Sequence, residues 1–131
     1  MKSDFGDPDD QAELYTDFDA LILPRRYGGL CLPMNEALLS GLPVIMPDCS
    51  PNNDVLPTHW LIPATRTGSF MARTEIELHE ADPRALGAQL DQLAGLSSDE
   101  LIQQKAEAYA LGYERFSMEA VRPVWEMVLR G

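Results

Sequence analysis

Two short apolar segments on either side of a helical pattern constrain the fold of this 131-residue chain more than any other feature. The first, "DALILP", closes at Pro24, and the second, "LPVIMP", closes at Pro47. Short, wholly apolar runs of this kind are typical of strands buried on both faces of a sheet. Between them, "PMNEALLSG" predicts a helix that opens at Pro33, carries an acid in its first turn and stops at Gly41. Strand, helix, strand is the pattern of a parallel α/β sheet.

The flanking segments extend this pattern only a little. "HWLIPA" is a plausible third strand, residues 65–74 look irregular, and "TEIELHE" alternates well enough for an edge strand. Residues 1–9 are polar and expected to be flexible, and "QAELYTDF" has the spacing of a short helix. The expected fold class is therefore α/β with few strands.

The chain becomes helical from residue 82 to residue 131. Asp82 can cap, and Pro83 can open, a helix with Leu86, Leu90 and Leu93 on one face. Ser97 and Glu100 have capping-box spacing, and the apolar residues that follow them at helical intervals are Ile102, Ala106, Tyr109 and Tyr113. Ser117 can cap a last helix, kinked at Pro123, whose inward residues are expected to be Val121, Val124, Trp125 and Val128. Together with the sheet, this tail predicts one domain over residues 1–131.

Charge and hydropathy exclude several classes of partner. The chain has 21 acidic and 10 basic residues, a net charge of −11, which disfavours binding to nucleic acid. No apolar run is long enough to span a bilayer, and the acidic start "MKSDFGDPDDQAE" is unlike a signal peptide. We therefore expect a soluble, cytoplasmic protein.

The cysteines do not indicate a metal site. Cys31 and Cys49 form no CxxC motif, and the chain's two histidines, His59 and His79, are not paired with them in sequence. Both cysteines are interpreted as small buried apolar residues, with a disulfide between them as the alternative. No metal and no cofactor are expected.

Two strand-to-helix turns are the candidate ligand sites, because ligands of parallel sheets lie beyond the carboxyl ends of the strands. The first turn is "PRRYGGLCLP" and the second is "PDCSPNNDVLP". In the first, Gly28 and Gly29 permit positive φ and expose backbone amides ahead of a helix N-terminus, which favours an anion. Arg25 and Arg26, the only adjacent basic pair, precede the glycines. A phosphate-bearing ligand fits this turn.

Each of these residues also has a purely structural explanation. Gly28 and Gly29 suit any tight turn. Glu36 near a helix N-terminus gains stability from the helix dipole alone. Arg25 and Arg26 are otherwise surface cations, and the polar residues 52–54 are ordinary in a turn. From the residues alone, both interpretations remain open.

A family resemblance favours the ligand-binding interpretation. The run "LILPRRYGGLCLPMNEALLSGLPVIMPD" resembles the donor-binding segment of retaining GT-B glycosyltransferases, the large group 1. That segment reads as a strand, Glu-Gly-Phe-Gly-Leu-Pro, two apolar residues, Glu-Ala and a Gly-x-Pro-Val-Ile strand, which "GLCLPMNEALLSGLPVI" follows position by position. "ADPRALGAQLDQL" and "YERFSMEAVRPVWEMVL" are similar to the family's later helices. The similarity covers the chain from about Tyr15 onward.

The resemblance implies a fold and an activity. The fold is a partial Rossmann-like sheet with a helical tail, the later part of the donor-binding half of the GT-B fold. The activity is metal-independent transfer of a hexosyl-type sugar from a nucleotide-diphosphate sugar to an unknown acceptor. By position, Glu36 matches the glutamate that binds the ribose hydroxyls. The family's diphosphate and sugar contacts fall on Gly29, Leu30, Cys31 and Leu32, with Arg25 and Arg26 as adjacent cations.

The chain departs from the family pattern in two places. Gly28 stands where the family has its first glutamate, the residue that contacts the transferred sugar. The acceptor domain and the basic early strands of the donor domain have no counterpart in this sequence. An alternative function is therefore a non-catalytic nucleotide-binding module, or one that pairs with a separate N-terminal half or a second copy to cover a sheet edge. An unrelated α/β protein with a phosphate-binding turn is a third interpretation.

Overall fold

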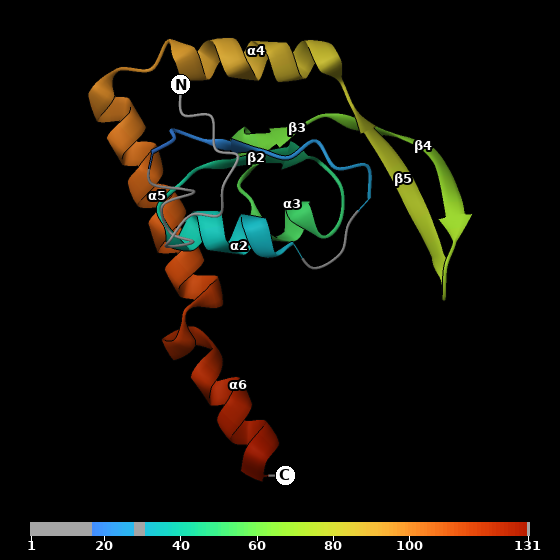
Figure 1. The fold of residues 1–131 in the computed structure, drawn as a ribbon, viewed down its shortest axis with the longest axis vertical. Helices are drawn as coiled ribbons and strands as arrows, with labels where there is room; N and C mark the ends of the chain where they lie inside the picture. Colours follow the sequence, from blue (N-terminus) through green and yellow to red (C-terminus); the bar gives the residue numbers. More distant parts are fainter. Residues whose placement is uncertain (1–16, 28–30, 131) are drawn as a thin grey trace, which may run out of the picture.

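The computed structural model describes residues 17–27 and 31–130 and shows an α/β fold. Three parallel strands, β1 (Leu21–Ile22), β2 (Val44–Pro47) and β3 (Leu61–Ile62), form a sheet in the order β1-β2-β3 (Figure 1). The expected parallel sheet is thus confirmed. The third strand is shorter than "HWLIPA" predicts, because Thr58–Trp60 form a 3-10 turn, η1, instead. The predicted helix at 11–18 and the predicted flexibility of residues 1–9 fall outside the described residues, apart from positions 17 and 18.

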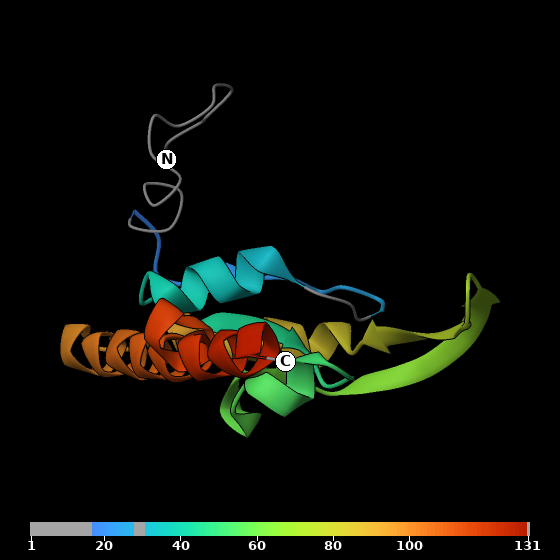
Figure 2. The same cartoon turned by 90° about the horizontal axis from the view of Figure 1, so that it is seen from below.

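Two helices cover opposite faces of the sheet (Figure 2). On one face lies α2 (Leu32–Leu39), and on the other lies the short α3 (Asn52–Val55). Gly41 follows α2 with a φ of 74°, a left-handed conformation that a residue with a Cβ adopts only at a cost. The predicted helix and its glycine stop are therefore confirmed.

The core is built around β2, all four residues of which are buried. The buried apolar residues come from α2, β2 and the segments up to β3, with Ala108 added from α5 (Ser98–Phe116). The largest of them is Trp60, whose Nε1 donates a hydrogen bond to Oε1 of Gln104 at 3.2 Å. This bond satisfies the buried indole nitrogen. Because Gln104 belongs to α5, the bond also holds α5 beside η1.

A β-hairpin extends from the carboxyl end of β3, where the sequence predicts irregular structure (Figure 1). Its strands are β4 (Ala64–Met71) and β5 (Glu75–Ala81), paired antiparallel with an irregularity between Arg66 and Gly68. The expectation for β5 is confirmed, and the irregular structure expected at 65–74 is wrong. β4 is mostly polar, so contacts with β5 stabilise it as a strand. One of them is the 2.8 Å hydrogen bond from Ser69 Oγ to Glu75 Oε1.

The predicted caps of the tail helices are confirmed. In α4 (Pro83–Ala94), Asp82 accepts a hydrogen bond from the amide of Arg84 at 3.0 Å. Ser97 accepts one from the amide of Glu100 at 3.2 Å and so begins α5. Ser117 separates α5 from α6 (Met118–Arg130) and accepts one from the amide of Ala120 at 3.1 Å. Local side-chain chemistry therefore sets these helix starts.

The inward orientation predicted for α6 is wrong. Val124, Trp125 and Val128 are exposed by 57%, 60% and 62%. The helix continues through Pro123 and points away from the sheet (Figure 1). Its amphipathic spacing predicts an apolar face, but the spacing contains no information about which surface covers that face. Within the part of the chain that the structure describes, most of this face is uncovered.

Close packing of α5 on α2 provides a test of the fold. A Cβ added at Gly112 would lie 2.6 Å from the carbonyl carbon of Leu38 and 2.7 Å from the nitrogen of Leu39, both backbone atoms that cannot move aside. We expect Gly112→Ala to lower the free energy of unfolding in urea by about 2 kcal/mol or more.

The matched control is Gly87→Ala in α4, where an added Cβ meets nothing within 4 Å. This variant is expected to gain about 0.5–1 kcal/mol, because alanine loses less conformational entropy in a helix than glycine. Equal unfolding midpoints for the two variants would contradict the contact between α5 and α2.

Candidate functional site

The carboxyl ends of β1 and β2 meet at one edge of the sheet, and the hairpin stands beside that edge (Figure 1). The amide of His79, in β5, donates a hydrogen bond to the carbonyl of Arg26, in the turn after β1. The ring of Tyr27 packs edge-on against Phe70 of β4, with ring centroids 5.4 Å apart. These two contacts hold the hairpin next to the first predicted ligand-binding turn.

The structure places part of the predicted site. Gly28, Gly29 and Leu30 lie outside the described residues, so their role stays a prediction. Cys31 is buried and immediately precedes α2, and Leu32 is the first helical residue and is exposed.

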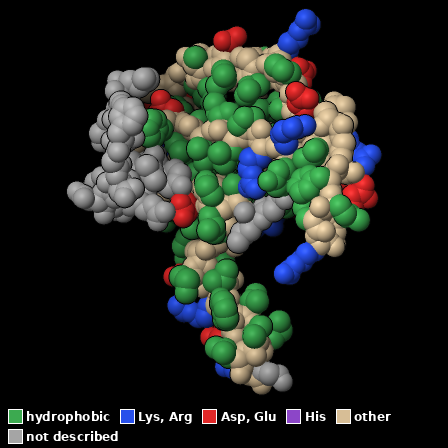
Figure 3. Space-filling model, turned by 45° about the vertical axis from the view of Figure 1, so that its right-hand side comes forward, with side chains coloured by type: hydrophobic (Ala, Val, Ile, Leu, Met, Phe, Trp, Pro, Cys, Tyr) green, Lys and Arg blue, Asp and Glu red, His purple; other side chains and the backbone are tan. Residues whose placement is uncertain are grey.

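The two arginines predicted to lie beside the ligand, Arg25 and Arg26, lie at the same edge of the sheet. Arg25 follows β1 and Arg26 begins the bend after it, and the amide of Arg25 donates to the carbonyl of Leu23. Arg66 and Arg73 are contributed by the hairpin and its tip, and Figure 3 shows basic side chains on the face that includes the hairpin. Despite the acidic total charge, Arg25 and Arg26 follow β1 at this edge.

The N-terminus of α2 lacks a side-chain cap. Cys31, in the capping position, accepts no hydrogen bond from the first turn through its side chain. The first amides of a helix have no partners within the helix and carry the positive end of its dipole. At the carboxyl edge of a parallel sheet, such an end can accept an anionic group.

Glu36 lies just beyond the first turn of α2, because the helix begins one residue earlier than the sequence predicts. The helix begins at Leu32, and its first turn contains no acid, so the expectation of a first-turn acid is wrong. Helix-dipole stabilisation falls off beyond the first turn, which weakens the purely structural explanation of this carboxylate. Helical spacing also puts Glu36 on the side of α2 away from the buried residues Met34, Ala37 and Leu38.

The turn after β2 is more ordered than a run of polar turn residues suggests. Asn53 Nδ2 donates to Asp48 Oδ1 at 3.1 Å. Asn52 is only 1% exposed, and its Nδ2 donates to the carbonyl of Pro47 at 3.3 Å. The Oδ1 of Asn52 is buried and has no hydrogen-bond partner among the described residues.

Both cysteines are buried and free, which confirms their interpretation as small buried residues, and no disulfide joins them. Burial raises the pKa of the Cys49 thiol, and the neighbouring Asp48 carboxylate raises it further. Arg25 acts in the opposite direction and lowers this pKa. Burial is the largest of these three effects on the Cys49 thiol.

An open pocket of about 410 Å³ lies between the turn after β2 and strand β5. We call it the β5 pocket; its lining residues are Asp48, Cys49, Ser50, Asn53, Glu75, Ile76, Glu77 and His79. The sequence does not predict this pocket. Half of its lining comes from β5, and the position of β5 beside the turn after β2 is set by tertiary structure. The alternation of "TEIELHE" was the one signal that could have indicated this wall.

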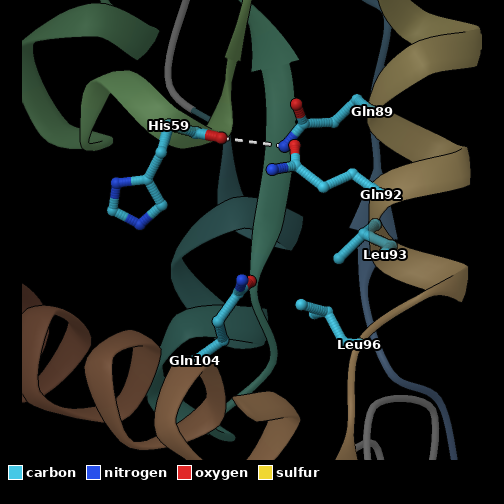
Figure 4. A pocket seen from close by; sticks show the side chains of 6 residues that line it. All are labelled: His59, Gln89, Gln92, Leu93, Leu96 and Gln104. Atoms are coloured by element: carbon cyan, nitrogen blue, oxygen red, sulfur yellow. Dashed lines mark hydrogen bonds between the residues drawn. The ribbon is translucent and has the colours of Figure 1, made fainter.

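A smaller pocket of about 50 Å³ lies where η1, α4 and α5 meet (Figure 4). Gln89 Nε2 donates to the carbonyl of His59 at 2.8 Å, and His59 Nε2 lies 3.0 Å from Glu107 Oε2. These polar contacts join the helical tail to the segment before β3. The pocket is far too small for a nucleotide, so we interpret it as part of the packing.

Within residues 17–27 and 31–130, no three side chains of His, Cys, Asp or Glu come together in a way that could hold a metal ion. No helix in the same part of the chain is both long and apolar enough to cross a membrane.

Comparison with known proteins adds no relative. No protein-family model, curated protein or solved structure matches the chain. Function must therefore be argued from the residues and the geometry.

The electrostatics of the second turn can be tested by alkylation of Cys49. We expect the native chain to react slowly with iodoacetamide at pH 8, because burial and the raised pKa leave little thiolate. Asp48→Asn removes a charge that raises the pKa and should speed the reaction. Arg25→Gln removes a charge that lowers it and should slow the reaction. Each change corresponds to at most about fivefold, or about 1 kcal/mol between neighbouring charges in water.

Peptide mapping by mass spectrometry separates Cys49 from Cys31, which serves as the internal control. Identical Cys49 rates in the two variants and the parent chain would show that Arg25 does not act at the second turn.

Proposed function

We propose that this chain is the later part of the donor-binding half of a retaining GT-B glycosyltransferase, binding a nucleotide-diphosphate sugar for transfer to an acceptor. The observation that carries the proposal is the position of Glu36. It follows a strand-to-helix turn at the carboxyl edge of the sheet, on the side of α2 away from the core. The family pattern puts its ribose-binding glutamate at this position in the sequence.

The chemistry of the ribose contact suits a carboxylate. A carboxylate accepts hydrogen bonds through both oxygens, and the 2′ and 3′ hydroxyls of ribose are neighbouring donors. Ser40 Oγ donates to the backbone carbonyl of Glu36 at 2.8 Å. The proposed role uses the side-chain oxygens of Glu36.

The diphosphate is proposed to lie against the turn after β1. The N-terminus of α2 has no side-chain cap, and Arg25 and Arg26 are adjacent to the turn. Amides, the helix dipole and a guanidinium would stabilise the charge that develops on the leaving nucleotide diphosphate. The backbone of Gly29 and Leu30 belongs to the same proposed site.

The transferred sugar is proposed to be held without a glutamate at position 28. Gly28 has no side chain to contact the sugar. The contact that the family makes there must come from backbone or from another segment of this chain, or it is missing. This position separates a full transferase site from one that binds only the nucleotide.

Isothermal titration with UDP-, GDP- and ADP-sugars tests the proposal. We expect one donor class to bind the parent chain, and Glu36→Ala to weaken that binding at least about tenfold. The loss corresponds to at least one hydrogen bond to a charged group, about 1.5–3 kcal/mol. Glu36→Gln should recover part of the affinity, because the amide keeps one acceptor oxygen.

The control is Glu114→Ala, which removes an exposed glutamate from α5. It should leave donor affinity unchanged. If the folded chain releases no heat with any donor, it does not bind a donor by itself. If Glu36→Ala leaves the affinity unaltered, Glu36 has only a structural role.

A second candidate function is a non-catalytic module that pairs with a separate half or with a second copy. The apolar face of α6 favours it; the exposed residues are Met118, Val124, Trp125, Met127, Val128 and Leu129. Among the described residues, β1 is also the edge strand of the three-stranded sheet, the position at which a partner strand can pair. An exposed apolar helix face of this kind marks an interaction surface in many proteins.

Light scattering tests the pairing of two copies. We expect a mass of at least two chains, and Trp125→Glu should return it to one chain by placing a charge on the apolar face. Glu126→Ala, next to it on α6, is the control and should not change the mass. A monomeric parent chain over a wide concentration range counts against self-pairing.

A further inference from the structure

The last helix, α6, carries its apolar face away from the sheet (Figure 1). Val124, Trp125 and Val128 on this face are all exposed, and Figure 3 shows apolar side chains along this part of the chain. An exposed apolar face on a helix is a surface on which another helix can pack. The charges beside the face decide which partner fits.

The charge of α6 favours a second copy of the same chain. The whole chain has a net charge of −11, so two copies repel one another on approach. The helix α6 is neutral, because its two glutamates are matched by two arginines. Two copies can therefore meet along α6 without adding like charges at the contact.

The two sides of the apolar face differ in chemistry. Helical spacing puts Arg122 and Glu126 one turn apart along one side, which we call the charged side. The other side, which we call the apolar side, carries Ala120, Val124 and Met127. A partner helix therefore meets different neighbours on its two sides.

This asymmetry selects the orientation of a paired copy. In a parallel pair, the charged side of one helix faces the apolar side of the other, which leaves Arg122 against apolar side chains. In an antiparallel pair, each side faces the same side of the second copy. A pair centred between Val124 and Trp125 then brings Arg122 within one residue of level with Glu126 of the second copy. Two-fold symmetry forms this ion pair twice.

The apolar residues match in the same register. Their positions on α6 are 121, 124, 125 and 128, a spacing that is the same in both directions along the helix. An antiparallel copy centred between Val124 and Trp125 therefore brings Val121 opposite Val128, and Val124 opposite Trp125, each contact twice. The charged residues and the apolar residues thus point to one register.

The direction of α6 leaves room for such a pair. Its 13 residues at 1.5 Å each make it about 20 Å long. Because α6 points away from the sheet, an antiparallel copy has its sheet at the opposite end of the paired helices (Figure 1). A parallel copy would bring the two acidic bodies side by side, where they repel one another.

We propose that α6 pairs antiparallel with α6 of a second copy of this chain, with Arg122 against Glu126 of that copy. The inference rests on the pairing module proposed above as the second candidate function, and it names the partner and the geometry. It does not depend on nucleotide-sugar binding, because α6 contributes none of the residues assigned to that site.

Apolar contacts supply most of the affinity in this arrangement, and the ion pairs set the orientation. An exposed ion pair changes a dissociation constant only about twofold to fivefold. Removing the charge of Glu126 therefore leaves the apolar contacts to hold the two copies together. Reversing a charge is the sharper test, because it opposes like charges twice.

Cysteine cross-linking of the full chain tests the orientation. In the antiparallel pair Val124 lies beside Val124 of the second copy, so Val124→Cys should form a disulfide-linked dimer under mild oxidation. Met118 lies about 20 Å from its own copy, and a disulfide spans Cα atoms only about 7 Å apart, so Met118→Cys should not. Cys31 and Cys49 are buried, and the oxidised parent chain is the control. A disulfide-linked dimer of Met118→Cys, or none of Val124→Cys, would overturn the antiparallel geometry.

Charge reversal tests the ion pair. Arg122→Glu and Glu126→Arg each oppose like charges, so each variant alone should dimerise at least about tenfold more weakly in sedimentation experiments. An equimolar mixture of the two should regain the affinity of the parent chain, because every acid then faces a base. Both variants remain strongly acidic overall, so net charge does not draw them together.

The matched control is Arg130→Glu, the same charge change on the side of α6 away from the apolar face. It should weaken dimerisation less than about twofold. Equal effects of Arg122→Glu and Arg130→Glu, or a mixture no tighter than the single variants, would overturn the contact between Arg122 and Glu126.

These outcomes separate the inference from the functions proposed above. A dimer that cross-links through Met118→Cys keeps the pairing function and loses the antiparallel geometry. A parent chain that is monomeric at all concentrations loses both. Neither result bears on the titration of nucleotide sugars, which tests Glu36 and the turn after β1.

Discussion

The complete burial of β2 is the constraint on which the rest of this structure depends. All four of its residues are buried, with β1 on one side and β3 on the other. Parallel pairing on both sides fixes the register, with Leu21 opposite Val44 and Met46 opposite Leu61. Since parallel strands end at the same edge, the turns after β1 and β2 are brought together there. The candidate site is thus a consequence of how the core is built.

Close packing then fixes the position of α2. Gly112 lets the backbone of α5 approach the end of α2. The hydrogen bond between Trp60 and Gln104 joins α5 to η1 as well. With α2 fixed, its uncapped N-terminus remains at the carboxyl edge and Glu36 remains on the side away from the core. The C-terminal helix α5 therefore supports the residues proposed to bind the nucleotide, although it is distant from them in the sequence.

The hairpin divides the carboxyl edge into two chemical environments. Near the start of α2, backbone amides and Arg25 favour negative charge. Between β5 and the second turn, Asp48, Glu75 and Glu77 disfavour it. A diphosphate would consequently prefer the part of the edge near the start of α2. The contacts of His79 with Arg26 and of Tyr27 with Phe70 keep these two parts adjacent.

The sequence by itself determined the elements whose signals are local. The apolar runs around Leu21 and Val44 predicted parallel strands, of which β2 is wholly buried and β1 only partly. Asp82, Ser97 and Ser117 predicted helix starts, because capping depends on neighbouring residues. Tertiary structure alone decided that β4 forms a strand, since a polar strand is stabilised by partners across the hairpin. It also decided that β5 lies beside the turn after β2 and forms one wall of the β5 pocket. It also decided that Glu36 lies beyond the first turn and that the apolar face of α6 is exposed. Periodicity fixes which face of a helix is apolar, and only packing determines what covers that face.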